Sequence, residues 1–155
     1  MSICKPDAIK SKIQKNQCLL GLDIGTKTIG VAISDTSLLI ASPLLLIKRQ
    51  KFTNDSNALL KTITKNNAGG LIIGLPLEMN GKEGKQAQST RTFIYNLLKI
   101  NKIPVVFWDE RLSTLTVERF MIEEADLSRN KRKKLVDKLA ATYILQGLLD
   151  LISTN

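Results

Sequence analysis

The stretch from Leu19 to Asp35 constrains the fold more than any other part of the chain, because it reads as two strands joined by a tight turn. Apolar residues alternate with small or polar residues through both halves, so each half places its apolar side chains on one face. In the first half, Asp23 shares the opposite face with Gly21 and Gly25. Aspartate is disfavoured inside strands. Asp23 is therefore either a solvated residue of an edge strand or, as we expect, a carboxylate that a metal ion or a phosphate can approach closely.

The composition excludes several classes of protein. The chain of 155 residues has no histidine and two cysteines, Cys4 and Cys18. Ser–His and Cys–His nucleophile pairs and His-ligated zinc are therefore impossible, and two thiols make neither a disulfide framework nor a good zinc site. Any chemistry must rely on carboxylates, lysine, hydroxyl groups, water or a hard metal ion. No apolar run is long enough to span a membrane, and the N-terminus lacks the apolar core of a signal peptide, so we expect a cytoplasmic protein.

The positive charge is concentrated in two segments. The formal net charge is +9 at pH 7, and most of it comes from residues 1–15 and 129–138. The second segment contains a basic cluster, which consists of Arg129, Lys131, Arg132, Lys133 and Lys134. These cations crowd the first turn of a predicted helix, where the macrodipole disfavours them, and a bound phosphate would reverse that penalty. We therefore expect the basic cluster to contact nucleic acid. For residues 1–16 we expect a flexible, solvated basic arm.

Hydrophobic periodicity predicts an alternation of strands and helices. Strands are expected at 17–25, 28–35, 38–47, 71–73 and 103–108, and helices at 55–66, 84–100, from Ser113 to about Glu124, and 130–151. The first three strands are close enough for an antiparallel meander, and the later β-α-β-α-β order predicts parallel strands. Gly69 and Gly70 are expected in a break before the fourth strand. We thus predict an α/β fold with a mixed five-stranded sheet and helices on both faces, forming a single domain over 17–152.

Two further carboxylates could join Asp23. Glu110 directly follows a buried strand, and α/β folds place their sites at the C-terminal ends of parallel strands. Asp137 lies on the last helix, at the edge of its predicted buried stripe, so it could face the boundary between helix and sheet. The alternatives are a surface turn in which Glu110 pairs locally with Arg111, and an i, i+4 pair between Asp137 and Lys133. Three carboxylates from distant segments suit Mg²⁺ or Mn²⁺, which prefer oxygen ligands and promote phosphodiester hydrolysis.

Four motifs occur in order along the predicted domain. They are Gly21-Leu-Asp-Ile-Gly-Thr with Ile-Gly-Val-Ala-Ile-Ser-Asp35; Ile73-Gly-Leu-Pro-Leu with Gly81, Gly84, Gln86 and Ala87; Asp109-Glu-Arg-Leu-Ser-Thr114; and Lys134-Leu-Val-Asp-Lys-Leu-Ala-Ala141 with Ile144-Leu-Gln146. With these motifs the chain resembles the YqgF/RuvX family, bacterial proteins of the ribonuclease H-like fold that are related to Holliday-junction resolvases. One departure is visible. The family usually has arginine after the turn lysine, Lys27, where this chain has Thr28, and lysine cannot form the same bidentate fork.

The resemblance implies a metal-dependent endonuclease that cleaves phosphodiesters with water. Position by position, it implies that Asp23, Glu110 and Asp137 are the catalytic residues and that they bind Mg²⁺ or Mn²⁺. The implied substrate is structured RNA at the 5′ end of the 16S ribosomal RNA precursor, with ribosomal particles as further partners, and the wider superfamily implies a monomer or a homodimer. The contacts with nucleic acid are expected from Lys27, Arg111 and the basic cluster.

Three other interpretations stay open from the sequence. A Holliday junction resolvase would use the same carboxylates on four-way DNA. A non-catalytic nucleic-acid-binding or ribosome-assembly factor would keep the fold, although it would have no reason to retain three acids. A sugar-kinase or actin-like ATPase shares the pattern from Asp23 to Thr26. That fold needs two such lobes, however, and a chain of this length supplies one.

Overall fold

The computed structural model describes the backbone of residues 2–110 and 129–154, and the side chains of 2–110 and 139–154. Two predictions, the helix from Ser113 to Glu124 and the role of Arg111, lie outside these residues. In chain order, the elements of the described part are the 3-10 helix η1 (Pro6–Ala8), α1 (Ile9–Lys12), β1 (Cys18–Ile24), β2 (Thr28–Ser34), β3 (Ala41–Lys48), α2 (Phe52–Lys65), β4 (Ala68–Leu75), α3 (Lys85–Ile100), β5 (Val105–Asp109) and α5 (Arg129–Ser153).

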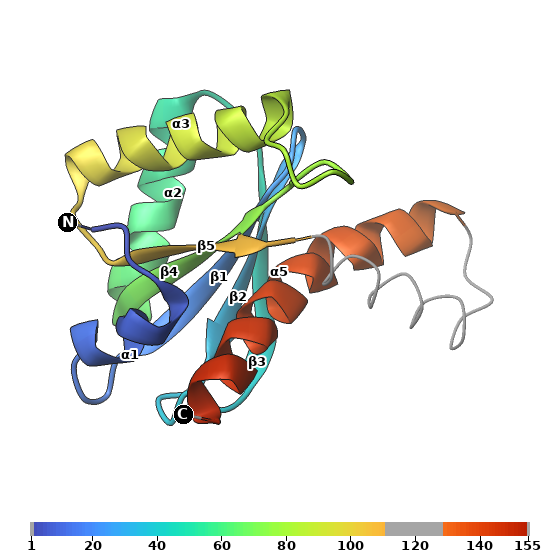
Figure 1. Ribbon diagram of the computed structural model, residues 1–155. Helices are drawn as coiled ribbons and strands as arrows, with labels where there is room; N and C mark the ends of the chain where they lie inside the picture. Colours follow the sequence, from blue (N-terminus) through green and yellow to red (C-terminus); the bar gives the residue numbers. More distant parts are fainter. Residues whose placement is uncertain (1, 111–128, 155) are drawn as a thin grey trace.

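The strands form one mixed five-stranded sheet in the order β3-β2-β1-β4-β5 (Figure 1). Strands β1, β2 and β3 pair antiparallel as a meander. Strands β4 and β5 then run parallel to β1 on its other side. The predicted α/β fold is confirmed, and β1, which carries Asp23, is its central strand.

Helices cover both faces of the sheet, as the sequence predicted. On one face, Leu20, Leu22 and Ile24 of β1 pack in a core that includes residues of α2 and α3. On the other face, Leu19 packs in a second core with residues of α5, which crosses the sheet as a long helix in Figure 1. The alternation predicted for the first strand is therefore present. It leaves Gly21 and Asp23 on the face that α5 covers.

Strand β4 is longer than predicted, because Gly69 and Gly70 belong to it and do not form a break. A Cβ atom at Gly70 would lie 2.9 Å from Leu19 Cδ2, and one at Gly69 would collide with the Gln17 side chain. Both glycines lie in the strand against side chains of Gln17 and Leu19, and neither forms a turn. A short apolar run flanked by glycines hides this distinction at the level of sequence.

The start of β3 and the start of α2 each differ from the prediction by three residues. Strand β3 begins at Ala41 because Asp35 Oδ1 accepts hydrogen bonds from the Leu39 and Ile40 amides, at 2.8 and 3.1 Å, and thereby closes a turn. Helix α2 begins at Phe52. The side chain of Asp55, in its first turn, accepts a hydrogen bond of 3.0 Å from the Gln50 amide. Local side-chain bonds of this kind override periodicity at element ends.

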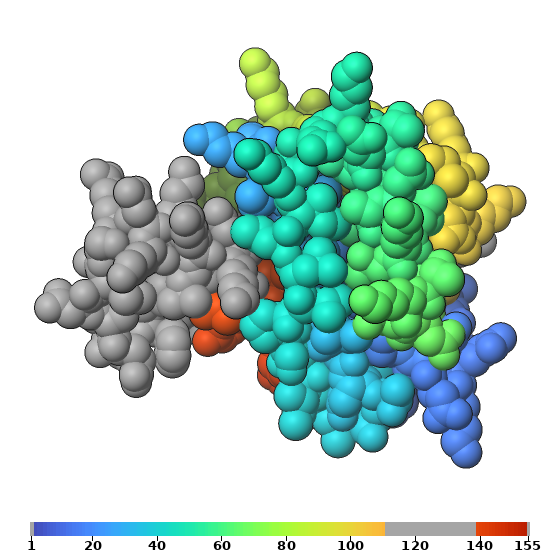
Figure 2. Space-filling view, turned by 180° about the vertical axis from the view of Figure 1, so that it is seen from behind, coloured from blue at the N-terminus to red at the C-terminus, as the bar shows by residue number. Residues whose placement is uncertain are grey.

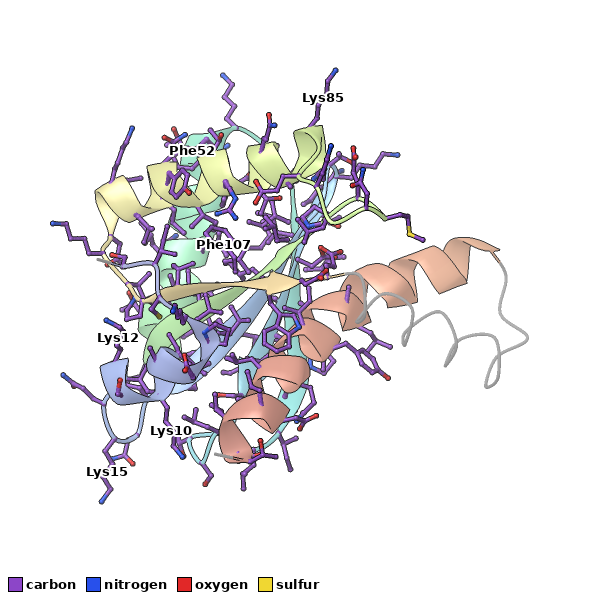
Figure 3. All side chains as sticks on the ribbon, viewed as in Figure 1. Lys10, Lys12, Lys15, Phe52, Lys85 and Phe107 are labelled. Atoms are coloured by element: carbon purple, nitrogen blue, oxygen red, sulfur yellow. The ribbon has the colours of Figure 1, made fainter. Side chains whose placement is uncertain are left out.

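Residues 2–16, which the sequence predicts as a flexible arm, pack against the sheet in this structure. The Cys4 amide donates to Val105 O at 2.9 Å, and the Val105 amide donates to Ser2 O at 2.8 Å. Ile9 is completely buried in the core beside α5. The physical reason is that β5 is an edge strand whose backbone groups need partners. The lysines of this segment point outward, as Figure 3 shows for Lys10, Lys12 and Lys15.

Among the helices of the described residues, none is both long enough and apolar enough to cross a lipid bilayer.

Candidate active site

Strand β1 places Asp23 beneath helix α5. A Cβ atom at Gly21 would lie 2.7 Å from both Ala141 O and Leu145 Cβ, so the backbone of α5 rests directly on the strand at this glycine. Asp23 is two residues further along the same face, and it is half-buried. The bare face that the sequence predicted around Asp23 therefore serves two purposes. It allows α5 to pack closely against β1 at Gly21, and it places the Asp23 carboxylate at the end of the strand.

Glu110 reaches the same place from β5. Its amide donates to Leu75 O at 3.2 Å, which holds the residue at the C-terminal end of β4. A Cβ atom at Gly74, between the two carboxylates in strand order, would lie 3.1 Å from Glu110 Oε2. The Glu110 side chain thus extends across β4 at a position where the backbone is bare. A Cβ atom at Gly74 would collide with Ile144 Cδ1 of α5 and would also crowd the Glu110 carboxylate.

The side chains of Asp23 and Glu110 form a hydrogen-bonded pair. Burial, the charge of Asp23, a hydrogen bond with Asp23 and the charge of Asp109 together raise the pKa of Glu110 from its ordinary value of 4.5 to about 8. The protonated Glu110 carboxyl donates this hydrogen bond to the Asp23 carboxylate, so the pair shares one proton at neutral pH. Such a concentration of negative charge in a partly dry position is a favourable place for a cation.

The backbone of Asp137 lies in α5, four residues before Ala141. Ala141, Ile144 and Leu148 are all buried against the sheet, and position 137 belongs to the same helical face because it precedes them by four, seven and eleven residues. Position 137 precedes Ala141 by four residues of helix, and Asp23 follows Gly21 by two residues of strand. Both distances are about 6 Å. Position 137 therefore lies near the end of β1 that carries Asp23. Its side chain is outside the described residues, and the described side chains form no group of three potential metal ligands.

The predicted nucleic-acid contacts are only partly described. Lys27 is exposed in the turn between β1 and β2, next to the carboxylate pair in the chain. The basic cluster, Arg129 and 131–134, occupies the first turns of α5 as predicted, and its side chains lie outside the described residues. Arg111 is outside them as well. Of the predicted site residues, the structure thus brings together Asp23 and Glu110 and places Lys27 in the turn beside them.

Sequence reasoning missed an arginine at this turn. Arg49 Nη1 donates to Gly25 O at 2.6 Å, while Arg49 Nε pairs with the fully buried Asp55 at 3.0 Å. The guanidinium also lies 5.3 Å from the centre of the Phe93 ring. Arg49 therefore fixes the hairpin that follows Asp23, close to Thr28. An acidic residue in the first turn of α2 was the available signal, because such residues commonly bind the preceding segment.

Comparison with solved structures identifies the fold. RuvC from T. thermophilus in complex with a Holliday junction covers 89% of this chain with a TM-score of 0.55 and 12% identity, and the match includes 97% of that chain. The yeast mitochondrial Holliday junction resolvase Ydc2 covers 94% with a TM-score of 0.53 and 12% identity, over 84% of its chain. The fold is thus the ribonuclease H-like α/β fold of these resolvases.

Sequence comparison identifies the family. The family model described as "RuvX: Holliday junction resolvase" matches residues 17–151. A protein from Paramagnetospirillum magneticum, named as a candidate pre-16S rRNA nuclease, is 51% identical over 150 residues, which are 97% of this chain and 96% of the relative. One from Phenylobacterium zucineum with the same name is 52% identical over 136 residues, 87% of each chain. The chain belongs to the RuvX family, and the resemblance found in its motifs is confirmed.

Proposed function

We propose that this protein is an endonuclease that depends on Mg²⁺ or Mn²⁺ and cleaves structured RNA at the 5′ end of the 16S ribosomal RNA precursor. The observation that carries the proposal is the meeting of Asp23 and Glu110 at the C-terminal ends of β1 and β5. The choice of substrate is supported by the names of the relatives, which are about half identical to this chain over nearly its whole length. A ribosomal substrate also favours a cytoplasmic location and contact with ribosomal particles.

The residues present fit a hard divalent cation. Asp23 and Glu110 offer carboxylate oxygens, which Mg²⁺ and Mn²⁺ prefer, and the absence of a side chain at Gly74 lets the Glu110 carboxylate lie over β4 toward Asp23. Asp137 on α5 is the third ligand in this proposal. A divalent ion held there would neutralise charge on a phosphate and lower the pKa of a water molecule. Burial and the charges of Asp23 and Asp109 raise the pKa of Glu110, and a cation at this place would offset both by taking the place of the shared proton.

The chain's own residues position the substrate around this pair. Helix α5 covers Gly21 on one side of Asp23, so a phosphate group would approach the carboxylate from the side of Gly25 and the turn, where the backbone carries no side chain. Lys27 is exposed in the adjoining turn and can contact a neighbouring phosphate. Arg49 holds that turn by its bond to Gly25 O. The positions of Lys27 and Asp23 relative to each other are therefore set by the hairpin.

The test is cleavage of a precursor rRNA fragment by the wild type and by Asp23→Asn and Glu110→Gln variants, in Mg²⁺ and in EDTA. We expect each substitution to lower the cleavage rate at least about 100-fold, because loss of residues that merely support a metal ligand already costs 10–100-fold. Asp7→Asn, an exposed residue far from the pair in the chain, is the matched control and should cleave normally. Unchanged cleavage by Asp23→Asn would refute the proposal.

A second candidate function is resolution of four-way DNA junctions, which the description of the matching family favours. A synthetic four-way junction is therefore assayed beside the RNA with the same variants. Preferential cleavage of the junction would show that the substrate is branched DNA and not RNA. The roles proposed for the carboxylates would stay the same. RNA binding that persists in EDTA, with no cleavage of either substrate in any metal, would instead identify a non-catalytic assembly factor.

A further inference from the structure

The end of the sheet opposite the carboxylate pair carries a basic surface that the proposed nuclease reaction does not use. Three distant segments meet there: residues 2–17, the end of α2 with the start of β4, and the link 101–104 before β5. The Asn67 side chain donates to Asn16 O at 3.2 Å, and the Leu71 amide donates to Pro104 O at 2.9 Å. Figure 2 shows the N-terminal segment in blue, the end of α2 in green and the end of α3 in yellow on this side of the molecule.

Two adjoining hollows open on this surface. One has a volume of about 530 Å³ and is lined by Ser2, Lys12, Lys102, Ile103 and Pro104. The other, of about 260 Å³, shares the last four of these residues and adds Ile63, Ala68 and Gly69 together with the amide-bearing residues Gln14, Gln17 and Asn101. Among the described residues, no carboxylate lines either hollow. The pair of hollows is therefore a groove with two cations and several hydrogen-bond donors, which we call the Lys12–Lys102 groove.

The charges of the groove are available for a ligand. Within the part of the chain that the structure describes, neither Lys12 nor Lys102 forms an ion pair, and both are exposed. Lys10 and Lys15 extend from the same segment (Figure 3), although neither lines the two hollows. Lysines also end the long helices α2 and α3, where they complement the helix dipoles. Lys12 ends only the single turn of α1 and Lys102 lies in a link, so neither has a long helix to complement.

We propose that the Lys12–Lys102 groove binds the phosphate backbone of the nucleic-acid substrate at a second contact, remote from the carboxylate pair. The proposal rests on the proposed nuclease function for the identity of the ligand. Lysine side chains, amide donors and a lining without carboxylates among the described residues match a polyanion, and they do not match a cationic partner.

The position of the groove sets a minimum length for the substrate. Pro104 lies just before β5 and Glu110 just after it, so about 20 Å separates the groove from the carboxylate pair at 3.3 Å per residue. Along one strand of a DNA duplex, phosphates follow one another every 3.4 Å, so a duplex substrate must extend about six base pairs or more from the cut to reach both places. The groove would thus favour long, structured substrates over short oligonucleotides.

The test is the affinity of a Lys12→Glu/Lys102→Glu double variant for a labelled hairpin RNA of about 40 nucleotides, measured in EDTA over a salt series. Two phosphate contacts contribute about 10–50-fold to affinity near 0.1 M salt, so we expect a loss of this size and a fall of about 1.5 in the slope of log K against log salt. A duplex DNA of the same length forms a second arm. An equal loss of affinity for the DNA shows that the groove contacts phosphate. A loss of affinity limited to RNA shows that it also contacts the ribose.

The matched control is Lys51→Glu/Lys61→Glu, which changes charge equally at two exposed lysines of the α2 region that line neither hollow. Affinity equal to that of the wild type, or an equal loss in the control, would overturn the proposal. Lys12→Gln/Lys102→Gln removes charge without adding carboxylates. It should retain the wild-type melting temperature and give a smaller loss in the same direction. Because binding is measured without metal, failure here is independent of failure of Asp23→Asn to abolish cleavage.

Discussion

Replacing Glu110 with glutamine should make the metal-free protein more stable at alkaline pH. In the folded protein the pKa of Glu110 is about 8, against an ordinary value of 4.5, because the carboxyl is buried beside Asp23. Between these two values the folded protein retains a proton that the unfolded chain has released. The contribution of Glu110 to the free energy of unfolding is therefore complete below about pH 4.5, and it is lost as the pH rises through about 8.

The size of this effect follows from the two pKa values. They differ by about 3.5, and each pKa unit corresponds to about 1.4 kcal/mol, so the loss is at most about 5 kcal/mol. For a chain of this length, 1 kcal/mol shifts the melting temperature by about 2–4 °C. Glutamine cannot ionise and keeps nearly the same shape. We therefore expect Glu110→Gln to melt about 5–15 °C above the wild type at pH 9 and close to it at pH 4.

The assay is thermal unfolding followed by circular dichroism in EDTA, from pH 4 to pH 9, with Asp7→Asn as the control for loss of an exposed carboxylate. The melting temperature of the wild type and the control should fall relative to Glu110→Gln as the pH rises. Excess Mg²⁺ at pH 8 should raise the melting temperature of the wild type more than that of Glu110→Gln, because a ligand stabilises only the state that binds it. Parallel pH curves for Glu110→Gln and the control would refute the account of the carboxylate pair.

Two further substitutions test how the sheet holds its neighbours. Gly21→Ala should lower the stability by about 1–3 kcal/mol and reduce RNA cleavage, since its Cβ would lie 2.7 Å from Ala141 O and displace α5 from Asp23; a melting temperature and a cleavage rate equal to those of the wild type would contradict the contact. Ile9→Ala should cost about 2–5 kcal/mol in urea unfolding because Ile9 is fully buried, whereas a residue in a loose arm would cost almost nothing.

The sheet could be predicted from the sequence because its signals are local. Alternation around Asp23 set the faces of β1, and the spacing of the first three strands allowed only short connections. The course of residues 2–16 could not be predicted in this way. Their attachment depends on Val105, about a hundred residues away, and on one buried side chain, Ile9, within an otherwise polar segment. A single apolar residue carries no periodicity, so the pattern resembled that of a free tail.

The candidate site was predictable to a similar extent. Asp23 was singled out by alternation within the first strand, and Glu110 by the rule that α/β folds place sites at the C-terminal ends of parallel strands. Their proximity follows from the order of β1, β4 and β5. The pairing of Arg49 with Asp55 and Gly25 was not foreseen, because a loop arginine has no preferred partner until the fold brings one near. The role of Gly74 could not be predicted from the sequence either, because it depends on the Glu110 side chain, which reaches it from the end of β5.

The pairing of Ser2 and Cys4 with Val105 has a consequence for how the chain folds during its synthesis. A ribosome that adds about 5–20 residues per second needs roughly 5–20 s to produce β5 after the N-terminal segment has formed. Throughout that interval the segment has no strand to join, and Ile9 stays in water. Residues 2–16 are thus made well before the strand that they join, and their arrival pairs the backbone of Val105 at the start of the edge strand β5.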